Sequence, residues 1–169
     1  MHMNKIKAQS AMEYLMTYGW AILIIAVVLG ALFSLGVFNS SSLIGTSCVA
    51  LSGYYCANPV LSTTGTLTLT VGQATGTTYT SATVYIVPSG QTFNSVDPAN
   101  YVIPGGLSTG QTVPVTITMP TSSAYTGFPS SYSTVGTTFT GYVWLAYTTP
   151  SSGPSVLESQ IATLSVKSS

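Results

Sequence analysis

A long apolar run near the N-terminus constrains the fold of this chain more than any other feature. Residues 18–38 read YGWAILIIAVVLGALFSLGVF, which is 21 residues without a charge. A helix of about 20 such residues spans the hydrocarbon core of a bilayer. Residues 22–25 and 27–29 are all Ile, Leu or Val, so a helix over them has no polar face. A soluble domain would have to cover every side of this helix, and we therefore expect lipid or copies of the same helix around it.

The segment before this run, MHMNKIKA at residues 1–8, is short and basic through Lys5 and Lys7. Such a segment is typical of the cytoplasmic side of a membrane. A conventional secretory signal is one alternative, in which an apolar region of about 7 to 15 residues follows the basic part closely. Here the apolar run is longer, and the polar stretch QSAME at residues 9–13 lies in between. The pattern therefore fits a secretory signal poorly.

The sequence KAQSAMEYL at residues 7–15, followed at once by the apolar run, resembles the class III signal of archaeal type IV pilins. The resemblance covers about residues 5–38. It implies that a prepilin peptidase cuts a leader, residues 1–8, between Ala8 and Gln9 on the cytoplasmic side. Residues 9–38 would then stay on the mature protein as a hydrophobic helix in the membrane or the filament core. Glu13 would be the fifth mature residue, where the family carries a glutamate, and Ala11 the third, where the family often has serine.

Glu13 is an isolated carboxylate at the edge of an apolar helix, where a charge costs free energy unless it has a partner. The N-terminus of a helix carries a partial positive charge, and an amine freed at Gln9 would add a full one. A subunit whose amine and carboxylate pair best across neighbours would dock in one axial register. Glu13 is therefore the candidate assembly residue. The plainer alternative is an interfacial charge with no role in assembly.

After Phe38 the composition changes to a linker at residues 39–46, NSSSLIGT, and then to a β-type domain at residues 47–169. Apolar residues alternate with Thr or Ser in several runs, which indicates strands with one buried face. We therefore predict an α+β chain, in which one long N-terminal hydrophobic α-helix precedes an all-β antiparallel sandwich of about seven strands, Ig-like in architecture. The strand candidates, separated by Gly, Pro and Ser clusters, are residues 65–71, 82–87, 101–103, 112–119, 137–147 and 156–166.

Two cysteines, Cys48 and Cys56, lie at the start of the β domain. They are too far apart for a C-x-x-C redox motif, and no histidine or further cysteine accompanies them for zinc. We expect a disulfide if the domain is exported, and two buried free thiols if it stays in the cytoplasm. With about nine residues in the loop, the chain-entropy model gives a stabilisation of about 2.6 kcal/mol.

Hydroxyl side chains supply most of the polarity of the chain, which has 26 Thr and 24 Ser but six charged residues. A nearly uncharged surface resists aggregation poorly by charge repulsion, and attached sugars could compensate. Asn39 begins a sequon for N-glycosylation, Asn39-Ser40-Ser41, next to the apolar run. Such tripeptides also occur often by chance, so Asn39 is a candidate for glycosylation.

The same composition argues against catalysis, a cofactor, a metal site and nucleic-acid binding. The single histidine, His2, lies in the predicted leader, which leaves the mature chain without histidine for a catalytic triad or a metal site. Asp97 and Glu158 would form a carboxylate pair only by accident of folding. No phosphate-binding glycine loop is present. The net charge of zero offers nucleic acid no electrostatic footprint.

These features and the resemblance together predict a non-enzymatic structural subunit of an extracellular archaeal type IV adhesion pilus. The resemblance implies a helical homopolymer, a prepilin peptidase, an assembly ATPase with its membrane platform protein, residence in the membrane before assembly, and contact with surfaces or other cells. Two alternatives stay open: an archaellin, the subunit of the related swimming filament, and a membrane-anchored surface binding module that never polymerises. Glu13 and the Tyr18-Gly19-Trp20 entry to the helix resemble the adhesion pilins more closely.

Overall fold

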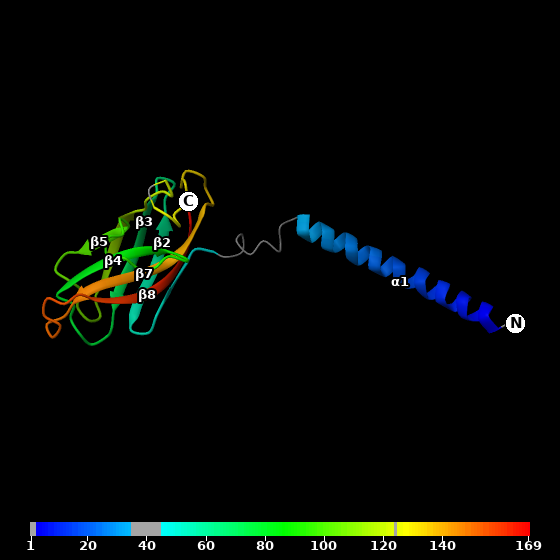
Figure 1. The fold of residues 1–169 in the computed structure, drawn as a ribbon, viewed down its shortest axis with the longest axis horizontal. Helices are drawn as coiled ribbons and strands as arrows, with labels where there is room; N and C mark the ends of the chain where they lie inside the picture. The colour runs from blue at the N-terminus through cyan, green and yellow to red at the C-terminus, as the bar shows by residue number, and fades with distance from the viewer. Residues whose placement is uncertain (1–2, 35–44, 124) are drawn as a thin grey trace. The chain divides into compact units, whose positions relative to one another are not determined.

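The chain divides into two compact units, residues 1–43 and residues 44–169. The computed structural model describes residues 3–34, 45–123 and 125–169, with side chains from Met12 onward except that of Leu15. The first unit contains one helix, and the second contains the strands (Figure 1). The predicted order, an apolar helix followed by antiparallel strands, is confirmed.

Helix α1 runs from Met3 to Ser34 over 32 residues, which at about 1.5 Å per residue gives a length of about 48 Å. Leu, Met, Ala and Lys favour helix, and no proline interrupts the segment. The helix begins before the predicted cleavage site, so Ala8 and Gln9 both lie within it. Residues 35–38, the predicted end of the helix, and most of the predicted linker lie outside the described residues.

Two antiparallel sheets make up the β domain (Figure 1). One sheet has five strands in the order β1-β8-β7-β4-β5, and the other has three in the order β2-β3-β6. Strands β1 and β2 are therefore edge strands of different sheets. The strands are β1 (Ser47–Ala50), β2 (Tyr54–Leu61), β3 (Thr66–Gln73), β4 (Ser81–Pro88), β5 (Asn100–Ile103), β6 (Thr112–Thr118), β7 (Thr138–Thr148) and β8 (Leu157–Lys167).

Both sheets contribute to a single hydrophobic core. In β3 the predicted alternation is confirmed, because Leu67, Leu69 and Val71 are buried while the threonines between them are more exposed. In β7 the same alternation leaves Tyr142 and Trp144 half-buried on the face opposite the core. The buried side chains of the described residues include no charged group. Burial of apolar surface therefore holds the two sheets together.

The six predicted strands correspond to β3–β8, but β1 and β2 lie where no strand is predicted. β1 has four residues, too few to show a period of two. In β2, Asn58 has a positive φ of 52°, Pro59 follows it, and the register with β3 shifts between Ala57 and Val60. A bulge disrupts the alternation of a strand, and proline cannot donate a hydrogen bond to the ladder. The described part of the domain therefore has eight strands where about seven are predicted.

Candidate functional site

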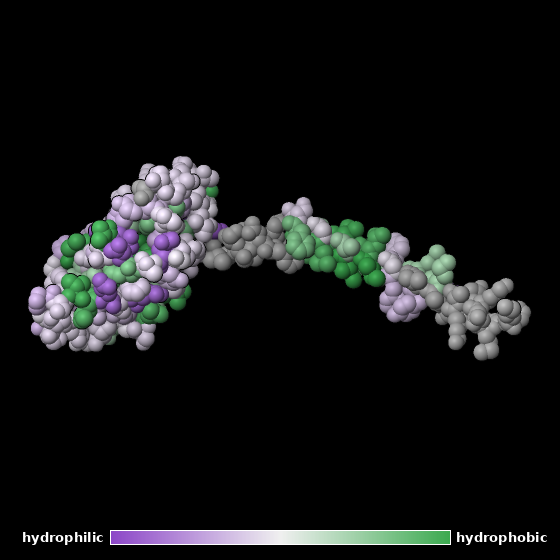
Figure 2. Space-filling view, in the orientation of Figure 1, coloured by the Kyte–Doolittle hydropathy of each residue, from purple (hydrophilic) through white to green (hydrophobic). Residues whose placement is uncertain are grey.

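The candidate membrane and assembly element is helix α1, whose apolar side chains are exposed. Thirteen large apolar side chains between Met12 and Phe33 are 43% to 80% exposed, and Figure 2 shows much of this stretch in green. Burying one such side chain contributes roughly 1.5–3 kcal/mol, so together they favour apolar surroundings by on the order of 20 kcal/mol. The segment Met12–Ser34 is long and apolar enough to cross a membrane. Lipid or other helices would remove this surface from water.

Glu13 lies at the polar end of the candidate span, and its side chain is exposed. Thr17, one turn further on, donates its hydroxyl to the backbone oxygen of Glu13 at 3.0 Å. The hydroxyl of Thr17 is therefore satisfied within the helix. Gln9 lies four residues before Glu13 on the same helix, and residues four apart share one helix face. The predicted mature N-terminus and the candidate assembly residue thus belong to the same face of α1.

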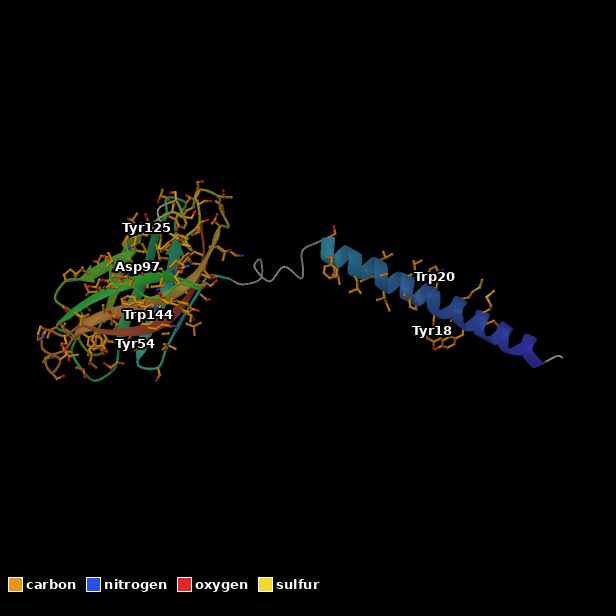
Figure 3. The ribbon with its side chains drawn as sticks, in the orientation of Figure 1. Tyr18, Trp20, Tyr54, Asp97, Tyr125 and Trp144 are labelled. Atoms are coloured by element: carbon orange, nitrogen blue, oxygen red, sulfur yellow. A yellow bond between two sulfur atoms is a disulfide. The ribbon has the colours of Figure 1, made fainter. Side chains whose placement is uncertain are left out.

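Aromatic residues surround this end of the span. The rings of Tyr14 and Tyr18 lie 4.2 Å apart between centroids, and Figure 3 shows Tyr18 and Trp20 on opposite sides of α1. Tyrosine and tryptophan are enriched where membrane helices meet the water interface. Their placement is consistent with a span whose N-terminal end lies at such an interface.

Three small residues, Gly19, Ala26 and Gly30, lie on one side of α1. A Cβ atom added at Gly19 or Gly30 would meet nothing within 4 Å, so no contact within the described chain requires glycine there. Ala26 lies seven residues after Gly19 and four before Gly30, spacings close to whole helical turns. Small residues on one side let the backbones of two helices approach closely.

Cys48 and Cys56 form a disulfide, with their Cα atoms 5.7 Å apart. The predicted bridge is confirmed, and it joins β1 of the five-stranded sheet to β2 of the three-stranded sheet. Both partners are edge strands, which have a neighbour in the sheet on one side alone. The bridge therefore ties together the two sheets at the start of the domain.

The two carboxylates of the β domain, Asp97 and Glu158, lie in the loop before β5 and near the start of β8. Burial raises the pKa of the Tyr85 hydroxyl, and the negative charges of Glu158 and then Asp97 raise it further. Partial burial also raises the pKa of Asp97, and a hydrogen bond with the backbone of Asn94 opposes that shift. No three His, Cys, Asp or Glu side chains within the described residues are grouped to hold a metal ion. Asn39 lies outside the described residues.

An aromatic depression on the outer face of the five-stranded sheet was not predicted from the sequence. Tyr85, Trp144 and Gln160 are register partners on the adjacent strands β4, β7 and β8. Phe93, from the loop after β4, stacks on Trp144 with ring centroids 5.0 Å apart and meets the ring of Tyr85 edge-on at 5.3 Å. The depression has a volume of about 540 Å³ and is lined by Gln91, Thr92, Phe93, Tyr142, Trp144, Glu158 and Gln160. The signal for it in the sequence is the pair Tyr142 and Trp144 on the strand face turned away from the core.

A tyrosine cluster lines a smaller depression of about 290 Å³. The hydroxyl of Tyr79 lies 3.1 Å from the hydroxyl of Thr75 and 3.4 Å from that of Tyr54. The rings of Tyr79 and Tyr147 stack with centroids 3.9 Å apart. Burial raises the pKa of both of these tyrosines. The hydroxyls satisfy one another, so this cluster is explained by packing.

Comparisons with known proteins do not assign this chain to a family. No known protein family matches the sequence, and no curated protein matches it either. Among solved structures it is similar to a DUF3823 family protein from Bacteroides ovatus ATCC 8483, at 12% identity and a TM-score of 0.41. The match covers 68% of this chain and 55% of the other, so the chain spans about half the length of that protein. Similarity at this level defines neither the fold family nor the function.

Proposed function

We propose that this chain is a structural subunit of an extracellular archaeal type IV adhesion pilus. Helix α1 forms the filament core with copies of itself, and the β domain forms the outer surface. The observation that carries the proposal is the exposure of apolar side chains all around α1, joined in one chain to a disulfide-bridged β domain. A helix without a polar face gains most from lipid or from a bundle of like helices. A bridge of this kind persists in an oxidising, extracellular setting.

Glu13 supports polymerisation over simple anchoring. A membrane anchor needs only apolar length. The candidate span from Met12 carries a carboxylate at its second residue, Glu13, which anchoring does not require. In a bundle this charge is surrounded by apolar side chains, where it is expensive without a partner. The freed amine of Gln9 on a neighbouring subunit would be that partner. Pairing between neighbours then sets one axial register for the helices.

For the β domain we infer an Ig-like sandwich. In an Ig domain the strands C, F and G are neighbours in one sheet, and A, B and E in the other. Strands β4, β7 and β8 follow the first order, and β2, β3 and β6 follow the second. Strand β5 then extends the first sheet beyond β4, and β1 extends it beyond β8.

The partners of this subunit are other copies, a prepilin peptidase, an assembly ATPase with its membrane platform protein, and the surfaces or cells to which the pilus adheres. The subunit resides in the membrane until it is assembled. It has no enzymatic role in this proposal. An archaellin would share this plan, and loss of swimming on deletion of the chain would favour that function.

The processing step tests the proposal. Replacing Ala8 with phenylalanine should block cleavage before Gln9 and abolish filaments, while the apolar segment from Met12 still inserts in the membrane. Filaments sheared from cells and viewed by electron microscopy, with mass spectrometry of the subunit N-terminus, provide the measurement. Filaments built from subunits that begin at Met1 would contradict the proposal. Abundant wild-type protein in the membrane, without filaments, would indicate a membrane-anchored binding module.

A further inference from the structure

The aromatic depression on the five-stranded sheet combines ring faces with hydrogen-bonding groups. Phe93 and Trp144 stack nearly parallel, with 19° between their planes, and Tyr142 lies beside them on β7. Gln160 and Glu158 line the same depression from β8. Amides both donate and accept hydrogen bonds, and a carboxylate accepts them at two oxygens. Pockets that bind small ligands have this character: mostly apolar walls with a few placed polar groups.

The strongly polar side chains of the domain are concentrated here. From residue 45 onward the sequence has ten Asn, Gln, Asp, Glu and Lys residues, and six of them fall in residues 91–100 and 158–160. Elsewhere the polar surface consists largely of Ser and Thr. Figure 2 shows strongly hydrophilic residues in purple beside green apolar ones on the visible face of the β domain. Solubility alone does not require amides and carboxylates to gather beside half-buried rings.

A second depression shares part of its lining with the aromatic one. A hollow of about 270 Å³ is lined by Asp97 and Tyr125 among others, and it shares Gln91 and Thr92 with the aromatic depression. Figure 3 shows Trp144, Asp97 and Tyr125 following one another across the domain. From the shared residues Gln91 and Thr92 we infer that the two depressions form one extended groove, which we name the β4–β5 groove after the loop that connects β4 and β5. A groove of this form suits a chain-like ligand.

We propose that the β4–β5 groove binds a neutral oligosaccharide of pyranose units. A pyranose ring presents C–H groups on its flat face, which pack on aromatic rings such as Trp144, and hydroxyls at its rim, which pair with Gln91, Gln160 and Glu158. The linings of both depressions contain no Lys, Arg or His, so an acidic sugar or a phosphate would meet carboxylates without a cation. A purely apolar ligand would remove the amides and Glu158 from water without partners.

This inference names a target class for the adhesive filament and in that respect rests on the proposed function. The groove belongs to the β domain alone, however, so binding can be measured on unassembled subunits. A failure to form filaments would leave sugar binding intact, and a failure to bind sugar would leave filaments intact. The two ideas can therefore fail separately.

The binding test uses the full chain in a detergent without a sugar headgroup, because such headgroups would compete for the groove. The chain has two tryptophans, Trp20 and Trp144, so the Trp20→Phe variant makes Trp144 the sole indole reporter. Titration with hexamers of α- and β-linked glucose, mannose and galactose should produce a saturable change in Trp144 emission for at least one of them. Absence of any saturable change up to about 10 mM would overturn the proposal.

Variants locate the site by calorimetry with the hexamer that binds. Trp144→Ala should weaken binding at least about tenfold, and Gln160→Ala, which leaves the ring packing in place, should weaken it several-fold. Tyr55→Ala removes an exposed ring on β2, in the other sheet, and should leave the affinity unchanged. Melting curves establish that each variant is folded, and Trp144→Phe replaces Trp144→Ala if the latter unfolds. Wild-type affinity in both the Trp144 and Gln160 variants would overturn the proposal.

Ligand length tests the continuity of the groove. Tyr125→Ala should weaken binding of the hexamer several-fold and have no effect on a disaccharide of the same sugar, because only the longer ligand extends past Gln91. An equal effect on both lengths, or on neither, would overturn the extended groove. A fatty acid or an apolar peptide that shifts Trp144 emission when no sugar does would assign the groove to a different ligand class and overturn the sugar proposal.

Discussion

Gly106 lies in the loop after β5, directly beside the backbone of Tyr79 and Thr80. It has a positive φ of 77°, and a Cβ atom there would overlap the backbone oxygen of Tyr79. The same stretch is held by two hydrogen bonds between the backbones of Tyr79 and Leu107, of 2.9 and 3.0 Å. Glycine is required here because the backbone has a positive φ and because there is no space for a Cβ atom.

We expect Gly106→Ala to lower the free energy of unfolding by about 3 kcal/mol or more, because the strain of a positive φ adds to a clash with backbone atoms. Gly105 is the matched control, since it has a φ of 78° and open space around its missing Cβ. Gly105→Ala should cost about 1 kcal/mol. Urea unfolding of both variants provides the measurement, and equal losses would contradict the assigned clash.

The burial of Tyr132 leads us to expect a loss of stability at alkaline pH. Tyr132 is buried, its hydroxyl donates to the backbone oxygen of Pro120 at 2.7 Å, and burial raises its pKa from 10 to about 12. The raised pKa means that the folded state holds the proton more tightly than the unfolded state. Its contribution to stability is therefore complete below pH 10 and is lost as the pH rises toward 12.

Tyr132→Phe should remove this part of the alkaline loss, while costing about 1 kcal/mol at neutral pH for the lost hydrogen bond. Free energies of unfolding measured between neutral pH and pH 12 would show the variant with a shallower decline than the wild type. A decline as steep as that of the wild type would contradict the role assigned to Tyr132.

Between strands, the disulfide is the covalent link from one sheet to the other. Cys48 on β1 and Cys56 on β2 belong to edge strands, which depend on fewer neighbours than central strands do. Replacing both cysteines with serine should lower the free energy of unfolding by about 2–3 kcal/mol, from the entropy of a loop of about nine residues. The same replacement should increase the rate of hydrogen exchange more in β1 than in β7.

Alkylation of protein that has been unfolded without a reductant tests whether the disulfide is present. Both cysteines should stay unlabelled without a reductant and react once it is added. Labelling of both before reduction would show free thiols. That result would place the domain in a reducing compartment, against its export.

Strands β3–β8 were predictable from the sequence, and β1 and β2 were not. Strands such as β3 and β7 alternate apolar and polar side chains because one face is buried, and this pattern is local. The irregular β2 was hidden by Pro59 and by the positive φ of Asn58. Its pairing with β3 depends on contacts distant in sequence, which override local preference.

At the scale of the whole chain, the candidate sites also differ in how far the sequence predicts them. Helix α1 was predictable because its apolar residues are consecutive, and the disulfide was predictable because the chain has two cysteines. The β4–β5 groove was not, because Phe93 reaches Trp144 from a loop across 51 residues of sequence. Loop conformation sets that contact, and no periodic pattern encodes it.

Incorporation of a Glu13→Gln variant into filaments tests most directly whether α1 polymerises in a fixed register. The change keeps the shape of the side chain and removes its charge, so membrane insertion and the stability of the β domain should not change. Cells would express the variant together with wild type, and mass spectrometry would compare its fraction in sheared filaments with its fraction in the membrane pool. Glu158→Gln, at an exposed carboxylate of the β domain, is the matched control and should show equal fractions.

The account predicts that the Glu13→Gln fraction in filaments falls at least about fivefold below its fraction in the membrane. The reason is that the freed amine of Gln9 on a neighbouring subunit loses its charged partner inside the bundle. Equal fractions in the two pools would contradict the account. They would show that Glu13 provides no docking preference and that apolar packing alone brings the helices together.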